Sequence, residues 1–131
     1  LKSAERIAEK NGLVSREFYI KQIGLAEKYK LFKLAAGYAE KLELPEKARE
    51  FYSKYLEDKI KVHEFPSKEV IQKAGLTERE YKTKFMERLE QDGYYRAAAD
   101  NAEGLGLVEK AKELRSRTSD KGYPWAVECI G

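Results

Sequence analysis

The stretch AEKLELPEKAREFY at residues 39–52 returns as AEGLGLVEKAKELR at residues 102–115, 63 positions further along a chain of 131 residues. In both stretches an Ala-Glu helix end leads through a turn between two leucines into a second charged helix. Pro45 stands at the first position of that second helix, where its missing amide hydrogen is not needed. The repeated unit is therefore predicted to be a turn that joins two helices into a hairpin.

The match extends well beyond the two quoted stretches. Residues 7–54 align with residues 70–117 without a gap, and 18 of the 48 pairs are identical. Shared Lys and Glu content would not keep so many identities in one register, so the sequence predicts an internal duplication. Within the first copy the turn pattern recurs at 8–13 and 39–44, which predicts two hairpins of about 31 residues in each copy.

Helical periodicity, punctuated by Gly and Pro, predicts an all-α fold of seven or eight helices. Thr77 followed by Glu80 predicts a capping box, and no segment alternates with the period of a strand. We expect a single domain made of a first copy (1–57), a linker (58–67), a second copy (68–117) and a C-terminal capping tail (118–131). The expected helices are 2–11, 15–29, 31–42, 45–60, 68–74, 78–91, 94–104 and 108–117.

Composition excludes several classes of site. Charged residues make up 37% of the chain while the net charge is only +3, so the two signs alternate along solvated helix faces. Cys129 is the only cysteine and His63 the only histidine, which argues against a disulfide and a zinc site. We interpret His63 as an exposed or locally hydrogen-bonded side chain and expect no cofactor. No apolar run is long enough for a membrane span, and Lys and Glu far outnumber Gln and Asn, which favours a cytoplasmic protein of a thermophile.

The run KAREFYSKYLE at 47–57, with the helix before it, places small and aromatic residues at helical spacing. The residues concerned are Phe32, Ala35, Ala36, Ala48, Tyr52 and Leu56, with Tyr95, Ala98, Ala99 and Ala111 in the second copy. This pattern resembles the tetratricopeptide-like class of helical repeats, although the unit is shorter than the usual 34 residues of that class. The resemblance implies antiparallel hairpins stacked as a right-handed α-α superhelix, with a groove for a partner.

By the same resemblance, a partner peptide or helix would bind in that groove, and the protein would act as a scaffold without chemistry of its own. The implied groove residues are Lys33, Gly37, Glu40, Lys41, Arg96, Asp100, Glu103 and Gly104. Their mixed charge favours a peptide over a nucleic acid. The chain is not expected to be an enzyme, since no nucleophile stands beside a base and no Gly-rich loop precedes a helix with phosphate-binding spacing.

The segment 71–95 offers an alternative, because it is similar to a helix-turn-helix. A short helix, a Gly-Leu-Thr turn and a longer basic helix are what a reader of the DNA major groove needs. Acidic residues share that helix and would repel phosphate, so nucleic acid is the less favoured partner. The residues that would contact phosphates or bases are Arg79, Lys82, Lys84 and Arg88. Tyrosines that stack on RNA bases are a further alternative, carried by Tyr19, Tyr29, Tyr38, Tyr94 and Tyr95.

The linker and the tail correspond to each other in the 63-residue register. Both segments are apolar-rich and carry one proline, and the last hairpin of a repeat array needs a cover for its apolar face. We therefore expect Tyr123, Trp125, Val127 and Ile130 to fold back on the final helices. Docking of the tail in a partner, or self-association through it, is the competing hypothesis.

Overall fold

The computed structural model describes residues 13–117 and 119–125. These residues form seven helices and no strand, so the all-α prediction is confirmed for the part of the chain that the structure describes. The helix expected at 2–11 lies outside the described residues, as do Val127 and Ile130 of the tail.

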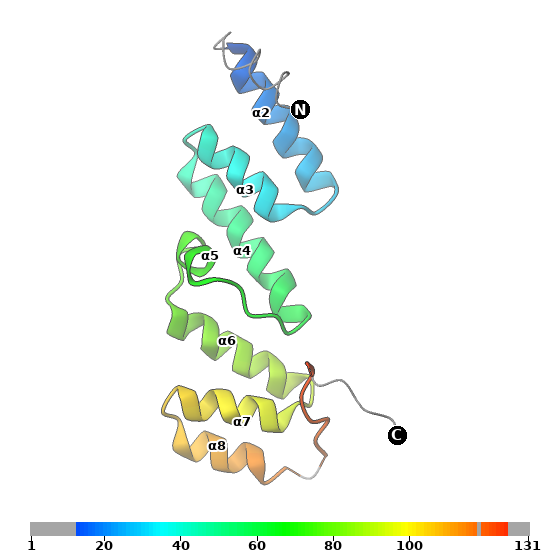
Figure 1. Ribbon diagram of the computed structural model, residues 1–131, viewed down its shortest axis with the longest axis vertical. Coiled ribbons are helices and arrows are strands. Elements are labelled where there is room, and N and C mark those ends of the chain that lie inside the picture. The colour runs from blue at the N-terminus through cyan, green and yellow to red at the C-terminus, as the bar shows by residue number, and fades with distance from the viewer. Residues whose placement is uncertain (1–12, 118, 126–131) are drawn as a thin grey trace. The chain divides into compact units, whose positions relative to one another are not determined.

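Each of the seven helices begins and ends within two residues of its expected bounds (Figure 1). They are α2 (Leu13–Lys28), α3 (Phe32–Lys41), α4 (Pro45–Lys61), α5 (Lys68–Lys73), α6 (Glu78–Gln91), α7 (Tyr95–Gly104) and α8 (Val108–Arg115). The chain divides into two compact units, one of residues 1–56 with 73–75, the other of residues 57–72 with 76–131.

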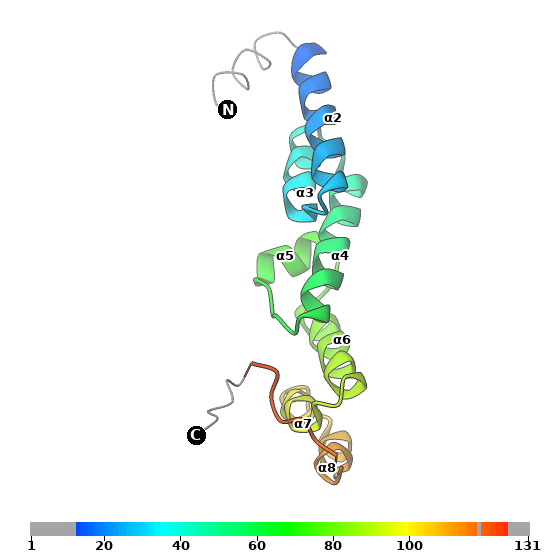
Figure 2. The ribbon, with the colours of Figure 1, turned by 90° about the vertical axis from the view of Figure 1, so that its right-hand side faces the viewer.

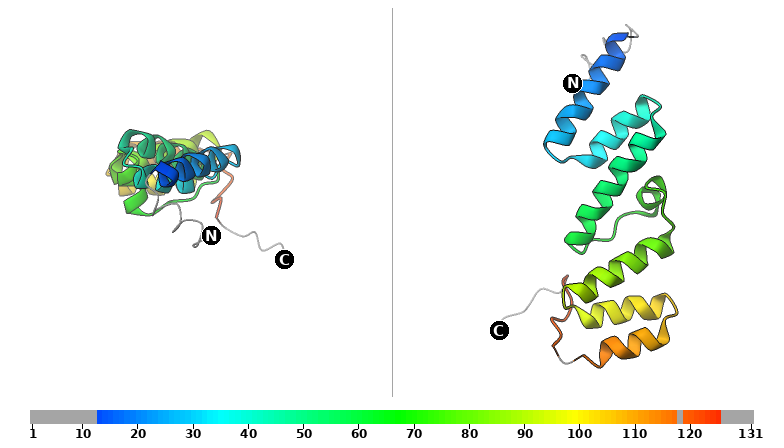
Figure 3. Two further views of the ribbon diagram at one scale, coloured as in Figure 1. Left: turned by 90° about the horizontal axis from the view of Figure 1, so that it is seen from above. Right: turned by 180° about the vertical axis from the view of Figure 1, so that it is seen from behind.

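In the first unit, α2 packs against α3 (Figure 3), and the core side of α3 carries only small residues. Ala35, Ala36 and Ala39 are fully buried, and their single methyl groups let neighbouring helices approach closely. Phe51 and Leu56 of α4 supply the large side chains of this core. Small residues on one helix and large residues on the next therefore fit together in the way the sequence pattern indicates.

In the second unit, α6, α7 and α8 pack side by side (Figure 2). The capping box at the start of α6 is confirmed, because the Thr77 hydroxyl accepts from the Glu80 amide while the Glu80 carboxylate accepts from the Thr77 amide. The fully buried side chains that hold these helices together are Tyr81, Leu89, Ala97, Ala98, Ala99, Ala102 and Leu114.

The helix ends share one turn. After α7, for example, Gly106 has a φ of 78° and the Leu107 amide donates to the Ala102 carbonyl at 2.8 Å. This is the Schellman motif, which satisfies the otherwise unpaired carbonyls of a helix end. The same motif closes α2, where Lys30 has a φ of 56° and the Leu31 amide donates to Ala26 at 2.8 Å.

Aromatic contacts hold the linker and the tail on α6. The Phe65 ring lies 5.1 Å from Tyr81 and 5.5 Å from Phe85, and the Trp125 ring stacks on Phe85 at 6.4 Å between centroids. The Tyr81 hydroxyl also donates to the Glu64 carbonyl at 3.2 Å. The linker was expected to begin at residue 58, but α4 continues to Lys61. Lys59 and Lys61 in its last turn interact favourably with the helix dipole, which supports the extra turn.

Replacing Gly106 with alanine should lower the free energy of unfolding by about 1–2 kcal/mol, because a Cβ is disfavoured at its left-handed φ. The added methyl would meet no atom of the described residues within 4 Å, so the loss of stability would come from the backbone conformation and not from a steric clash. Gly104→Ala is the matched control, since its Cβ also meets nothing and its backbone is helical. Urea denaturation of both variants checks this, and equal effects would contradict the assignment.

Candidate binding groove on α3

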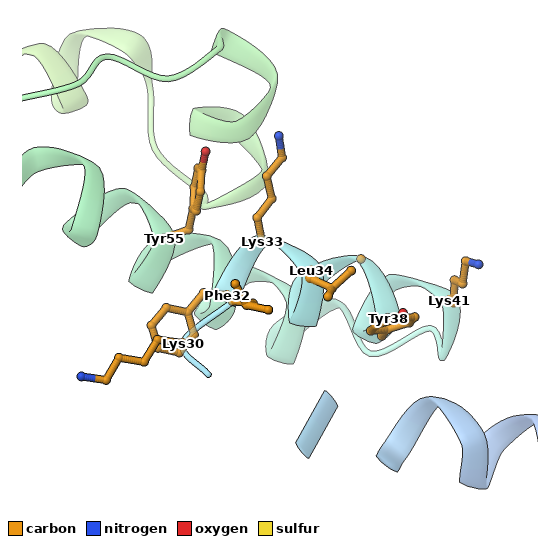
Figure 4. Close-up of a pocket in the computed structure, with 9 residues that line it drawn as sticks. Lys30, Phe32, Lys33, Leu34, Tyr38, Lys41 and Tyr55 are labelled. Atoms are coloured by element: carbon orange, nitrogen blue, oxygen red, sulfur yellow. The ribbon is translucent and has the colours of Figure 1, made fainter. Parts of the chain in front are cut away.

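A groove with a volume of about 720 Å³ runs along one face of α3 in the first unit. Its lining comes from α3 and the turn before it, with one residue from α4 (Figure 4). These residues are Lys30, Leu31, Phe32, Lys33, Leu34, Gly37, Tyr38, Lys41 and Tyr55. Three of the predicted partner-binding residues, Lys33, Gly37 and Lys41, are thus brought together. A Cβ added at Gly37 would meet no atom of the described residues within 4 Å, so this position leaves space in the groove.

The α3 groove combines exposed apolar surface with positive charge. Leu31 and Leu34 are 51% and 49% exposed. The Lys33 ammonium lies 5.8 Å from the centre of the Tyr55 ring, and the Lys41 ammonium lies 5.2 Å from that of Tyr19. No acidic residue is among the described residues that line the groove. The groove is therefore suited to a ligand that is apolar on one side and negatively charged on another.

The apolar lining of the groove was missed in the sequence. Leu31, Leu34 and Tyr38 have helical spacing, which is typical of residues that face a core. The 63-residue sequence register carried a signal that this spacing alone does not, because Leu34 corresponds to Ala97, which is fully buried. A large residue where the other copy buries a methyl group indicates a different environment.

Glu40, the fourth predicted residue of the first copy, lies elsewhere. Its carboxylate accepts from the Tyr52 hydroxyl at 2.7 Å and pairs with the Lys73 ammonium at 3.4 Å. Burial, then the hydrogen bond to Glu40, raises the pKa of Tyr52. Burial acts to lower the pKa of Lys73, but Tyr52 and Glu40 outweigh it and the net shift is upward. Glu40 therefore ties α3 to its neighbours and does not line the groove.

The predicted residues of the second copy engage other parts of the second unit. Arg115 of α8 pairs with Asp100 at 2.9 Å and with Glu103 at 3.1 Å. The Tyr123 hydroxyl donates to Asp100 at 2.9 Å, and this hydrogen bond raises the pKa of Tyr123. Arg96 pairs with Asp120 at 2.8 Å. Gly104 is exposed at the end of α7.

The tail closes the amino-terminal end of α7, which has no cap from its own N-cap residue. The Asp120 carboxylate accepts from the Tyr95 amide at 3.0 Å and from the Arg96 amide at 3.4 Å. The Lys121 amide donates to the Gly93 carbonyl at 3.0 Å. Because only 10% of the Asp120 side chain is exposed, these contacts form a sheltered link between tail and helix. Tyr123 thus lies on α7, whereas Trp125 stacks on Phe85 of α6 and is 55% exposed. The expected covering role of the tail stays a prediction.

The cations of the helix-turn-helix alternative have partners within the protein. Arg79 donates to the Leu105 carbonyl at 3.0 Å, and Arg88 pairs with Asp92 at 2.8 Å. Lys82 lies 3.7 Å from Glu78, and Lys84 is exposed one turn after Glu80. Among the tyrosines considered for base stacking, Tyr19 is buried and Tyr29 is 65% exposed. A phosphate ligand would have to compete with three internal partners for these side chains.

His63 occupies a different environment from the one expected. Its Nε2 lies 2.7 Å from the Asp92 carboxylate, and its ring packs edge-on against Tyr94 with centroids 5.0 Å apart. Only 14% of the side chain is exposed, and Asp92 is 29 residues away in the chain. The expectation of an exposed or locally bonded histidine is thus wrong, because the turn after α4 presents His63 to the end of α6.

No protein-family model matches the chain, and comparison with curated proteins and with solved structures finds no significant match. Within residues 13–117 and 119–125, no group of three or more His, Cys, Asp or Glu side chains could hold a metal ion. No helix in that same part of the chain is long and apolar enough to cross a membrane.

Asp92→Asn should destabilise the protein by about 1–3 kcal/mol near neutral pH, because it weakens charge-assisted hydrogen bonds to Arg88 and His63. Burial acts to raise the pKa of Asp92, but these two partners lower it below its usual 3.8. A lowered pKa gives stability that is present above the usual value and is lost as the pH falls through the folded-state value. The difference between variant and parent should therefore shrink below about pH 4. Urea denaturation between pH 5 and pH 3 checks this, and a constant difference would contradict it.

Proposed function

We propose that this chain is a non-catalytic interaction module, and that it binds a segment of a partner protein in the α3 groove. The observation that carries the proposal is the juxtaposition of exposed Leu31 and Leu34 with the cations Lys33 and Lys41 in one hollow. Contiguous apolar surface rimmed by polar groups is typical of binding sites. The same surface left in water would favour aggregation, so a partner that covers it is the simpler explanation.

The mechanism is recognition by a preformed surface. The backbone of α3 is fixed by the turn before it and by the buried face of Ala35, Ala36 and Ala39. Little ordering is therefore needed on the protein side when a ligand binds, and the loss of conformational freedom falls mainly on the ligand. Apolar contacts with Leu34 supply affinity, while the lysines select the charge of the ligand.

We further propose that the two copies arose by duplication and that the hairpins stack as a tetratricopeptide-like superhelix. Support comes from local geometry that recurs 63 residues apart: α3 and α7 begin at Phe32 and Tyr95, and α4 and α8 at Pro45 and Val108. The cross-helix bond from Tyr52 to Glu40 also has a counterpart in the pair of Arg115 with Glu103. The cytoplasmic, thermophilic setting stays a prediction from residue usage.

Peptide binding is preferred to nucleic-acid binding on charge grounds. The basic side chains of α6 are largely paired, whereas the lysines of the groove stand beside apolar side chains that phosphate would not use. A gel shift with duplex DNA across a salt series separates the two functions, since a phosphate-led complex must weaken steeply with salt.

Gly37→Leu should weaken peptide binding about tenfold or more, because a Cβ at this position meets no described atom within 4 Å and the rest of the side chain would occupy space in the groove. Peptides selected from a random display library against the full chain provide the ligand. Gly24→Leu is the matched control, since Gly24 is also helical, meets nothing within 4 Å and does not line the groove. Fluorescence anisotropy measures both. Selected peptides that bind all three proteins equally would rule out the groove as the binding site.

A further inference from the structure

The second unit shows what covers the face of α7 that corresponds to the α3 groove. Five residues of the groove have counterparts 63 positions later that contact tail residues 120–123. The pairs are Lys30 and Gly93, Leu31 and Tyr94, Phe32 and Tyr95, Lys33 and Arg96, and Gly37 and Asp100. The contacts are a backbone hydrogen bond from Lys121 to Gly93, hydrogen bonds to the Asp120 carboxylate, the Lys121 ammonium over the Tyr94 ring, and the Tyr123 hydroxyl bond to Asp100.

The backbone at the two helix starts is nearly the same. Leu31 has φ −92° and ψ 68°, and Tyr94 has φ −93° and ψ 70°. Both residues donate their amide to the preceding helix at 2.8 Å. The amides at the start of α3 are therefore presented in the way that the Asp120 carboxylate recognises at the start of α7. No side chain of the N-cap residue accepts from them in α3.

The groove is open because α4 is longer than α8. The helix α8 ends at Arg115, after which the chain crosses to α7, while α4 remains helical to Lys61. Residues 53–61 of α4 are the counterparts of residues 116–124, so the segment that would form a covering tail is held in a helix. Tyr55 of that helical segment lines the groove and does not fill it.

The differences between the two copies define the ligand. Lys30 and Lys41 stand in the groove where the second copy has Gly93 and Gly104, so the groove is the more basic of the two. Gly37 replaces Asp100, which removes the acceptor of the Tyr123 hydroxyl and leaves space. The groove is therefore still suited to a ligand carboxylate, but it has no counterpart of Asp100 to accept a hydrogen bond from a ligand hydroxyl.

We propose that the α3 groove takes an extended acidic segment of a partner protein in the way α7 takes the tail. An Asp or Glu carboxylate of this segment accepts from the amides of Phe32 and Lys33 and pairs with the Lys33 ammonium. An apolar side chain that follows it covers Leu34 and Gly37. This inference rests on the proposed function and adds the chemistry of the ligand.

The test uses the full chain and three labelled peptides that copy residues 119–125, with phenylalanine in place of the tyrosine: SDKGFPW, SNKGFPW and SKKGFPW. We expect SDKGFPW to bind about tenfold or more tightly than SNKGFPW, and Lys33→Glu to remove that preference. Lys33→Glu should instead favour SKKGFPW, which a merely destabilised variant would not do. Lys28→Glu, an exposed change outside the groove, should leave all three affinities unchanged.

Amide chemical shifts locate the bound peptide, and three results would overturn the proposal. If SDKGFPW perturbs Tyr95 and Arg96 but not Phe32 and Lys33, the peptide displaces the tail and does not use the groove. If display-selected peptides lose binding in Gly37→Leu, lack acidic residues and bind Lys33→Glu unchanged, the acidic ligand is wrong while the proposed function stands. If the chain dimerises in sedimentation experiments and Lys33→Glu abolishes the dimer, the occupant is the tail of a second copy and not a partner protein.

Discussion

The structure depends on how its helices end. From α2 to α7 each helix closes with a residue at positive φ, followed by an amide that donates five residues back. This turn satisfies the last carbonyls of one helix and aims the chain into the next, so hairpins of defined geometry follow each other without long loops. The positive-φ residues are Lys30, Glu43, His63, Gly75, Gly93 and Gly106. The end of α8 has no such residue among those described, and there the chain leaves the hairpin pattern as a tail.

The alanines make sense in light of these turns. A turn that fixes the start of a helix also fixes how near its neighbour lies, and only a narrow side chain fits where two backbones come close. Ala35, Ala36 and Ala39 in one copy, and Ala98, Ala99 and Ala102 in the other, meet that requirement and are fully buried. With one face of α3 committed to close packing, its larger apolar residues are left on the opposite face, where they line the groove.

Much of the fold could be predicted from local signals. Glycine or proline marks most of the breaks, and the capping box at Thr77 depends on residues three apart, so helix bounds were within two residues of those observed. The register of the two copies also showed which positions are buried, as with Ala48 and Ala111. The site was harder, because exposure depends on what another segment covers. Glu40 and Lys33 look equivalent in the sequence of one helix. In the structure Glu40 contacts Tyr52 and Lys73, whereas Lys33 lines the groove. The pairing of His63 with Asp92 joins residues far apart in the chain, and no local pattern indicates it.

The early end of α8 has a consequence for stoichiometry. The chain after Arg115 lies over the start of α7, whereas the start of α3 has no side-chain cap from its N-cap residue within the part of the chain that the structure describes. Under the proposed binding mode, one open helix start takes one ligand and cannot bridge two, so the segment after Arg115 would set the number of ligands bound. The tail thus resembles an intramolecular ligand with a very high effective concentration, which keeps the second position occupied even when external ligand is abundant.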